Sequence, residues 1–298
     1  MKNKYAKNKV KENGKLTRFI FFLVIVVFDI LVLFPILNVI AVSFSSYASY
    51  SENPTMIFPK QITLQTYKTV FATAKIWTGY QTTIIITVAG TIIGVVLTVI
   101  TAYSLSKPYL KGRKIIMPLI LFTMFFNGGM IPNYFLIKWL NLYDTRTALI
   151  LPGCLTAYNV ILMKNFFESL PQSLMEAAKI DGASEPKVLF KIVIPLSKPI
   201  VSVITLFLAV GYWNNYFNGI LYIKTQAKWP LQLVLREIIT AADSLKQSTG
   251  GNLAEAGTAV PAIMLQYASI VVAMVPILCV YPFIQKYFEK GIMMGAVK

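Results

Sequence analysis

The chain contains no histidine, only two cysteines and few charged residues. Charged side chains make up 13% of its 298 residues, whereas a soluble domain carries about 25%. Without histidine, the commonest general base and the commonest metal ligand are absent. Cys154 and Cys279 both lie in apolar stretches, so we expect small core residues there rather than a disulfide or a zinc site. The sequence offers no catalytic or metal-binding constellation and predicts a protein that is not an enzyme.

The phosphate-binding pattern Gly-x-x-x-x-Gly-Lys-Ser/Thr is also missing. In many ATPases that pattern supplies the backbone amides and the lysine that hold the nucleotide phosphates. We therefore expect that this chain does not hydrolyse ATP by that chemistry and binds no cofactor of its own.

Hydrophobic residues, in contrast, make up 56% of the chain and occur in continuous blocks. About 20 apolar residues are enough for a helix to cross a bilayer. The blocks predict an all-α integral membrane protein in which residues 17–298 form one transmembrane domain. Six spans are expected, at residues 17–43, 80–106, 115–138, 147–167, 199–223 and 262–287.

The charges indicate how these spans are oriented. The formal net charge is +16, and residues 1–16 form a basic tail. Most lysines and arginines fall in this tail or in segments on the same side of the membrane, and cytoplasmic segments are enriched in these residues. Both termini are therefore predicted to be cytoplasmic. Anionic lipid headgroups, not nucleic acid, are the expected counterpart of the charge. The long outer segments, 44–79 and 224–261, are expected to be loops.

The longest cytoplasmic connection, residues 168–198, carries signals for two short helices. Ser169 is a candidate cap for the first helix, and Gly182 is placed to end it in a left-handed conformation. Ser184 is a candidate cap for the second helix, and Pro195 interrupts the path into the next span.

Two interpretations of this connection are open from its residues. Ala177, Ala178 and Ala183 leave little bulk, so that another protein's surface could approach the backbone closely. Glu176 and Asp181 offer charge to a basic partner. An ordinary amphipathic loop that folds back onto the bundle explains the same residues equally well.

The connection resembles, in residue identity and spacing, the cytoplasmic coupling motif of the membrane subunits of ABC importers. The matching residues are Glu176-Ala177-Ala178, Asp181-Gly182-Ala183, Phe190, Ile194-Pro195 and Pro199. Other segments are similar to sugar, oligosaccharide and maltose-type permeases; they include Phe58-Pro59, Thr63-Leu64, and residues 127–132, 147–152, 211–214 and 290–298.

The resemblance implies a type I, MetI-like permease fold with six transmembrane helices in a bacterial cytoplasmic membrane. It implies pairing with a second permease subunit in a heterodimer, on two copies of an ABC ATPase that bind ATP-Mg. An extracytoplasmic binding lipoprotein would deliver an oligosaccharide. The residues implied to couple the ATPase to alternating access are Glu176, Ala177, Ala178, Asp181, Gly182, Ala183 and Pro195.

Polar and aromatic residues gather in the fifth and fourth predicted spans. Amides are costly in lipid unless they are partnered, so these side chains are expected to face the bundle interior or a watery path. Aromatic faces with amide donors suit sugars, although helix packing explains any single residue as well. The candidates for the translocation path are Tyr212, Trp213, Asn214, Asn215, Tyr216, Asn218, Tyr158 and Asn159.

Glycines and prolines suggest close packing and interruptions within the spans. Gly90 and Gly94 form a small-x-x-x-small pair, for which close helix packing is expected. Gly128, Gly129 and Pro132 interrupt the third span, either as a broken helix or as a kink.

Two other functions remain compatible with this architecture. One is an ABC permease for a peptide or an amino acid. The other is a secondary transporter, which should carry coupling carboxylates in several spans. Asp29 is the one deeply placed carboxylate, so this second alternative is the weaker.

Overall fold

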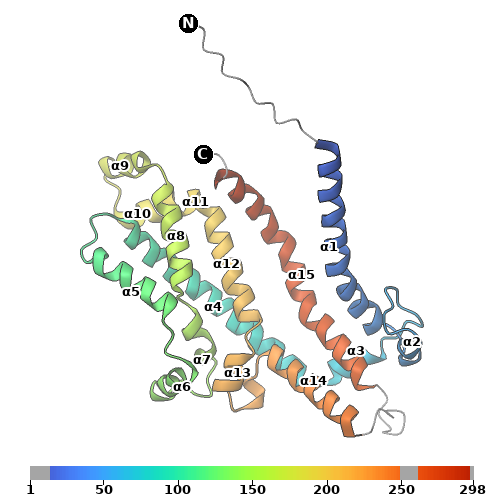
Figure 1. The fold of residues 1–298 in the computed structure, drawn as a ribbon. Helices are drawn as coiled ribbons and strands as arrows, with labels where there is room; N and C mark the ends of the chain where they lie inside the picture. Colours follow the sequence, from blue (N-terminus) through green and yellow to red (C-terminus); the bar gives the residue numbers. More distant parts are fainter. Residues whose placement is uncertain (1–13, 249–260, 296–298) are drawn as a thin grey trace.

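The computed structural model describes residues 14–248 and 261–295, and every regular element in those ranges is a helix. The predicted basic tail lies almost wholly outside them. Four long helices give the molecule its length (Figure 1). They are α1 (Gly14–Ser43), α4 (Ala74–Ser106), α12 (Lys198–Trp213) and α15 (Ala262–Gly295).

Figure 1 shows the start of α1 and the end of α15 at the same end of the molecule as the connection between α8 (Ala157–Ser169) and α12. We call this the inner end, because it corresponds to the side predicted to be cytoplasmic. The opposite end, the outer end, carries α13 (Phe217–Tyr222) and α14 (Leu231–Ser248).

Helix α4 lies at the centre and packs against α8, α12 and α14. Two glycines make this approach possible. A Cβ atom on Gly90 would lie 2.5 Å from the ring of Tyr212, and one on Gly94 would lie 2.9 Å from the carbonyl oxygen of Cys154. The expected close packing at this pair of glycines is confirmed.

The third and fourth predicted spans are not continuous helices. Helices α5 (Arg113–Phe125) and α6 (Met130–Trp139) meet at 117°, so the third span is a broken helix rather than a kinked one. Gly129 permits the break because its φ of +94° is readily adopted by glycine. The fourth span bends by 47° between α7 (Thr147–Ile150) with its 3₁₀ turn Leu151–Gly153 and α8.

The outer segments contain helices where loops were expected. Most of residues 224–248 form α14, after a 3₁₀ turn at Gln226–Lys228. Leu231, Val234 and Leu235 are buried on one face of α14, and their helical spacing is the signal that the loop prediction missed. Residues 44–79 contain α2 (Tyr47–Glu52), α3 (Gln65–Ala72) and the first turns of α4.

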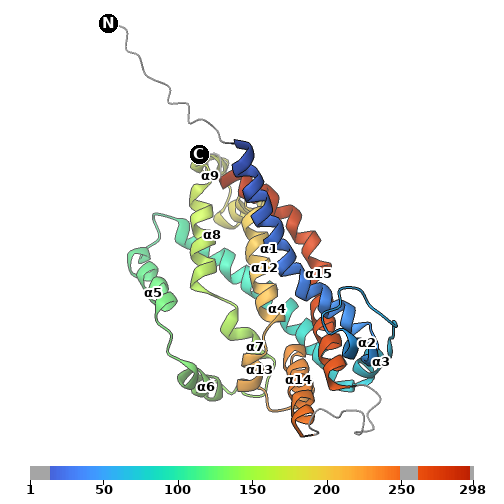
Figure 2. The same cartoon turned by 45° about the vertical axis from the view of Figure 1, so that its right-hand side comes forward.

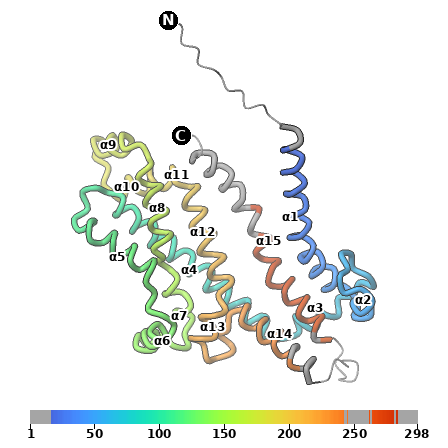
Figure 3. Tube along the Cα trace, viewed as in Figure 1, coloured from blue at the N-terminus to red at the C-terminus, as the bar shows by residue number. Residues whose placement is uncertain are grey.

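Helix α1 is peripheral. None of its most apolar window is buried, and Asp29 lies on its exposed surface. It meets α15 near the outer end, where Ala41 and Val42 pack with Met264; the two helices converge there in the tube of Figure 3. On another side of the bundle, α5 and α6 stand away from α12 (Figure 2).

By length and composition, two of the described helices could cross a membrane, Thr17–Ser43 and Ala74–Ser106. Up to five spans result if each of the three bent pairs counts as one. The apolar part of α15, Ile263–Cys279, is a further shorter segment. Cys154 is buried as expected, but Cys279 is exposed on α15 and is not a core residue of this chain.

Candidate functional site

The connection between α8 and α12 folds as two short helical segments around a tight turn. Helix α9 (Gln172–Ile180) is followed by α10 (Glu185–Val188), a π-helical turn at Leu189–Val193 and α11 (Ile194–Leu196). Gly182 lies between them with a φ of +75°. No atom lies within 4 Å of the place where its Cβ would be, so glycine serves the backbone conformation here and not close packing.

The predicted caps and the predicted interruption of this connection can be compared with the structure. Ser169 is the last residue of α8 and Pro171 is the cap of α9, so the predicted cap at Ser169 is wrong. Ser184 does occupy the cap position of α10, although its side chain makes no capping hydrogen bond. After Pro195 the chain bends by 84° into α12, which agrees with the expected interruption.

The residues expected to dock a partner divide into an exposed and a packed group. Glu176, Ala177 and Asp181 are exposed, whereas Ala178 and Ala183 pack against the buried core. Pro195 is exposed. Large apolar side chains accompany the exposed group, most clearly Ile180, of which 86% is exposed. The exposed group therefore combines two carboxylates with a large apolar side chain, and lysines of the same loop are exposed around it.

A carboxylate fixes the loop to the rest of the molecule. Glu185 accepts hydrogen bonds from the hydroxyls of Tyr103, at 2.5 Å, and Tyr109, at 2.6 Å. The Nζ atoms of Lys179 and Lys107 lie 2.5 Å and 4.0 Å from its oxygens. We call these five residues the Glu185 anchor. They join α9 and α10 to the inner end of α4 and to the loop after it.

The electrostatics keep this anchor ionised. Partial burial alone would raise the pKa of Glu185, but hydrogen bonds from Lys179, Tyr103 and Tyr109 and the charge of Lys107 outweigh it and lower the pKa to about 2. Sequence reasoning assigned Glu185 only to the first turn of a helix. Its partners come from 6 to 82 positions away along the chain, so no local pattern indicated them.

A second carboxylate at the inner end joins α5 to α8. Glu168 accepts from Arg113 at 2.5 Å and from Lys164 at 2.7 Å. Lys164 is buried, and this pairing satisfies its charge within the bundle.

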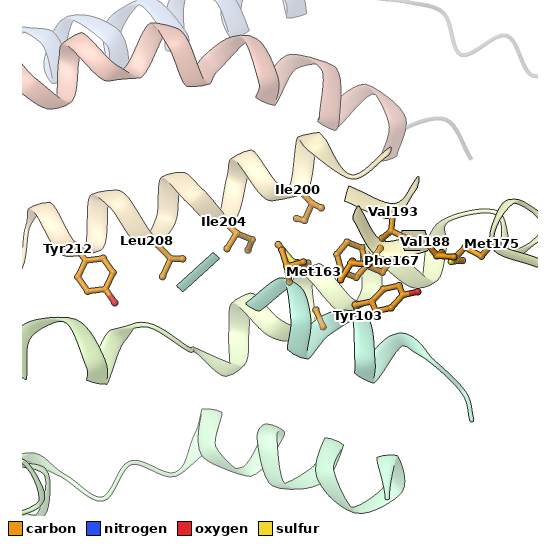
Figure 4. Close-up of a cluster of buried hydrophobic side chains, with 13 residues drawn as sticks. Tyr103, Met163, Phe167, Met175, Val188, Val193, Ile200, Ile204, Leu208 and Tyr212 are labelled. Carbon is orange, nitrogen blue, oxygen red and sulfur yellow. The ribbon is translucent and has the colours of Figure 1, made fainter. Parts of the chain in front are cut away.

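A row of buried side chains continues from the loop into the transmembrane helices. Figure 4 shows this row from Met175 on α9, past Val188 and Phe167, to Ile204 and Tyr212 on α12. Such packed interiors resist local deformation. The row thus forms a continuous packed connection between α9 and the outer end of α12.

Two of the candidate path residues complete this packing. Tyr212 is buried and donates its hydroxyl to the carbonyl oxygen of Ile150 at 2.8 Å. Trp213 is also buried, and its indole Nε1 donates to the carbonyl oxygen of Ala273 at 3.2 Å. In this conformation both side chains support helix packing.

Five of the other six candidates are more exposed than these two. Asn214 and Tyr216 are exposed, Asn215 donates to the carbonyl oxygen of Leu149 at 3.4 Å, and Asn218 is half-buried. On α8, Tyr158 is 52% exposed and its ring lies near that of Phe207, whereas Asn159 is buried. The eight candidates thus do not line one common surface.

At the outer end, Asp144 joins two connecting segments. It accepts from the backbone N–H groups of Lys224 and Thr225, at 3.1 and 2.9 Å, and from the Thr225 hydroxyl at 2.6 Å. Lys228 pairs with it at 3.2 Å. We call these four residues the Asp144 anchor. The hydrogen bond from the Thr225 side chain leads the causes that lower the pKa of Asp144 to about 2.

Residues 94–294 match the family described as the binding-protein-dependent transport system inner membrane component. The chain belongs to this family. The match covers α8 to α12 with the whole connection between them, and it confirms the expected membership in the ABC importer permeases. Members of this family are transport components and not enzymes, as the sequence predicted.

Several relatives of this permease cover almost its whole length. Protein LplC of Bacillus subtilis (strain 168) is 46% identical over 89% of this chain and 88% of its own. The polygalacturonan/rhamnogalacturonan transport system permease protein YtcP of the same strain is 41% identical, over 92% of this chain and 95% of its own.

A solved structure shares the fold of this permease. It is a chain of a bacterial ABC transporter involved in the import of the acidic polysaccharide alginate, with a TM-score of 0.84 and 34% identity. The alignment covers 93% of this chain and 98% of that one. The permease therefore has the all-helical, MetI-like fold of these importers. In the described part of the chain, no three His, Cys, Asp or Glu side chains are grouped to hold a metal ion.

Proposed function

We propose that this permease forms half of the translocation path of an ATP-driven importer of saccharides. In this proposal the chain crosses the membrane six times, with both termini and the loop from α9 to α11 in the cytoplasm. The observation that carries the proposal is the loop itself, which presents exposed Glu176, Asp181 and Ile180 while Met175 and Val188 join it to the core.

The importer would contain a second, different permease subunit and two copies of an ABC ATPase, which bind ATP-Mg. An extracytoplasmic binding lipoprotein would deliver the saccharide. The family description supports the binding protein, and the names of the relatives support saccharides over peptides or amino acids. This chain itself holds no cofactor.

In this mechanism α9 docks on an ATPase subunit, with Glu176, Ala177, Asp181 and Gly182 at the contact. Closure of the ATPase pair moves α9, and the Glu185 anchor makes α9, α10 and the inner end of α4 move together. The buried row then passes the displacement to α12. Rocking of such a body opens the path alternately to the two sides.

The test is uptake by the complete transporter in proteoliposomes. Glu176→Lys replaces an exposed acid with a base, and Gly182→Pro removes the left-handed turn. Both variants should reach the membrane and lose ATP-driven uptake. Lys114→Glu, a charge reversal at the same end but outside the loop, is the matched control and should transport normally. Normal uptake by either loop variant would contradict the docking role.

A further inference from the structure

A hollow of about 430 Å³ lies at the outer end, between the end of α12, α14 and α15. Its size falls within the range of small-molecule sites, about 300–1,000 Å³. Most of its wall is apolar. The polar side chains on the wall are Asn214, Tyr216, Gln232, Arg236 and Ser269.

Arg236 is a cation without an acidic partner among the residues that the structure describes. Glu237, the next residue on α14, is engaged elsewhere, since it pairs with Lys75 at 3.1 Å. Arg236 is exposed on the wall of the hollow. Its charge is therefore available to an anion that enters from outside.

The guanidinium of Arg236 is also oriented. Its central carbon lies 5.0 Å from the centre of the Tyr216 ring. This is within the range of a cation–π contact, and the described structure gives the N–H groups of Arg236 no carboxylate, so they can bind one through two parallel hydrogen bonds.

Ser269 also belongs to this wall, but its side chain is fully buried, so its hydroxyl does not face the open part of the hollow. On the same wall, Gln232 Nε2 donates a hydrogen bond to Asn214 Oδ1 at 3.5 Å, and the other polar atoms of the two amides, Gln232 Oε1 and Asn214 Nδ2, remain available to a ligand.

We propose that this hollow is a subsite for an acidic saccharide, with Arg236 binding the carboxylate of a uronic acid residue. The Tyr216 ring and the amides of Asn214 and Gln232 contact the sugar. The inference rests on the proposed saccharide transport and specifies the chemical class that this subunit selects. Arg236 is then a specificity-determining residue.

Thermal unfolding of the assembled transporter in nanodiscs, without the binding protein, tests the subsite directly. Ligands that bind the folded state raise the unfolding midpoint in a concentration-dependent way. Trigalacturonate and the neutral trigalactose are the two probes. In the wild type we expect trigalacturonate to raise the midpoint at concentrations about tenfold lower than trigalactose, because its carboxylates form charge-assisted hydrogen bonds.

Arg236→Gln should remove this preference, and Arg236→Lys should keep part of it. The matched control is Lys68→Gln, which removes an exposed outer cation away from the hollow and should retain the full preference. Equal shifts with the two probes in the wild type, no shift with either, or a preference that survives Arg236→Gln would each overturn the subsite. A second permease subunit that fills the hollow would produce the absence of any shift.

Uptake in proteoliposomes with the binding protein separates this inference from the function on which it rests. If the wild type imports saccharides but shows no preference in the unfolding test, only the subsite is wrong. If the wild type imports no saccharide at all, the proposed function fails and the subsite with it.

Discussion

The two ends of the permease each hold a connecting segment through one carboxylate, but the donors differ in kind. At the inner end, Glu185 is bound entirely by side chains, from Tyr103, Tyr109 and Lys179, with Lys107 nearby. At the outer end, Asp144 is bound by two backbone N–H groups as well as by side chains, all within residues 224–228.

The Glu185 anchor therefore connects separate helices, whereas the donors of the Asp144 anchor all come from one short loop. Backbone donors are fixed by the fold, so the Asp144 anchor holds one local geometry. The Glu185 anchor gathers side chains from α4, the following loop and α9, and these long side chains can follow one another when the helices move. Under the proposed mechanism, the inner end would transmit the displacement of α9, and the outer end would keep its local geometry.

The largest expected effect comes from Glu185→Ala. The substitution leaves the buried Lys107 and the positive Lys179 without their carboxylate, and α9 loses its polar connection to α4 while the packing of Met175 remains. We expect uptake to fall by about tenfold or more, since hydrogen bonds to charged groups are among the stronger ones. ATPase activity of the assembled transporter should persist, as measured by phosphate release. Parallel loss of both activities would instead indicate failed assembly.

Gly90→Ala tests the packed row that lies between the two anchors. The added Cβ would lie 2.5 Å from the Tyr212 ring, which a hydrogen bond to Ile150 holds in place. Overpacking of this kind costs about 1–3 kcal/mol, so the unfolding midpoint and uptake should both fall. The matched control is Gly211→Ala, where no atom lies within 4 Å of the new Cβ. Equal behaviour of the two variants would contradict the tight contact.

Asp144→Ala should affect stability more than transport. The backbone N–H groups of Lys224 and Thr225 would lose their acceptor and turn to water, because this segment is exposed. We expect a lower unfolding midpoint with uptake reduced by less than about threefold, since exposed polar interactions contribute little. A loss of uptake as large as that of Glu185→Ala would remove the distinction between the two ends.

The smallest effect is expected from mild acidification. Both carboxyls have a pKa of about 2, below their ordinary values of 4.5 and 3.8. A lowered pKa means that the contribution to stability is complete above the ordinary value and is lost only as the pH falls toward 2. The protection of the amides against hydrogen exchange in α9 and in residues 224–228, relative to the intrinsic exchange rate at each pH, should therefore be the same at pH 7 and pH 5. Lower protection at pH 5 in either segment would contradict its anchor.

The sequence predicted the parts of this molecule that depend on local pattern. Long apolar blocks predicted the helices. Gly182 predicted the turn after α9, and the prolines predicted the bend before α12. The break at residues 151–156 was missed because Pro152 alone does not reveal that Tyr212 supports the interrupted backbone. The anchors were missed for a related reason, since their partners are distant in sequence. Helix α14 was missed because residues 224–261 were expected to form a loop, and only the helical spacing of Leu231, Val234 and Leu235 indicates a helix there.

The contact between α1 and α15 has a consequence for the biosynthesis of the chain. These are the first and the last helices, so α1 leaves the ribosome long before the surface on which Ala41 and Val42 pack exists. At synthesis rates of roughly 5–20 residues per second, the wait is on the order of ten to forty seconds. During that time α1 sits in the membrane without its partner within the chain, and the fold closes only when the final helix is inserted.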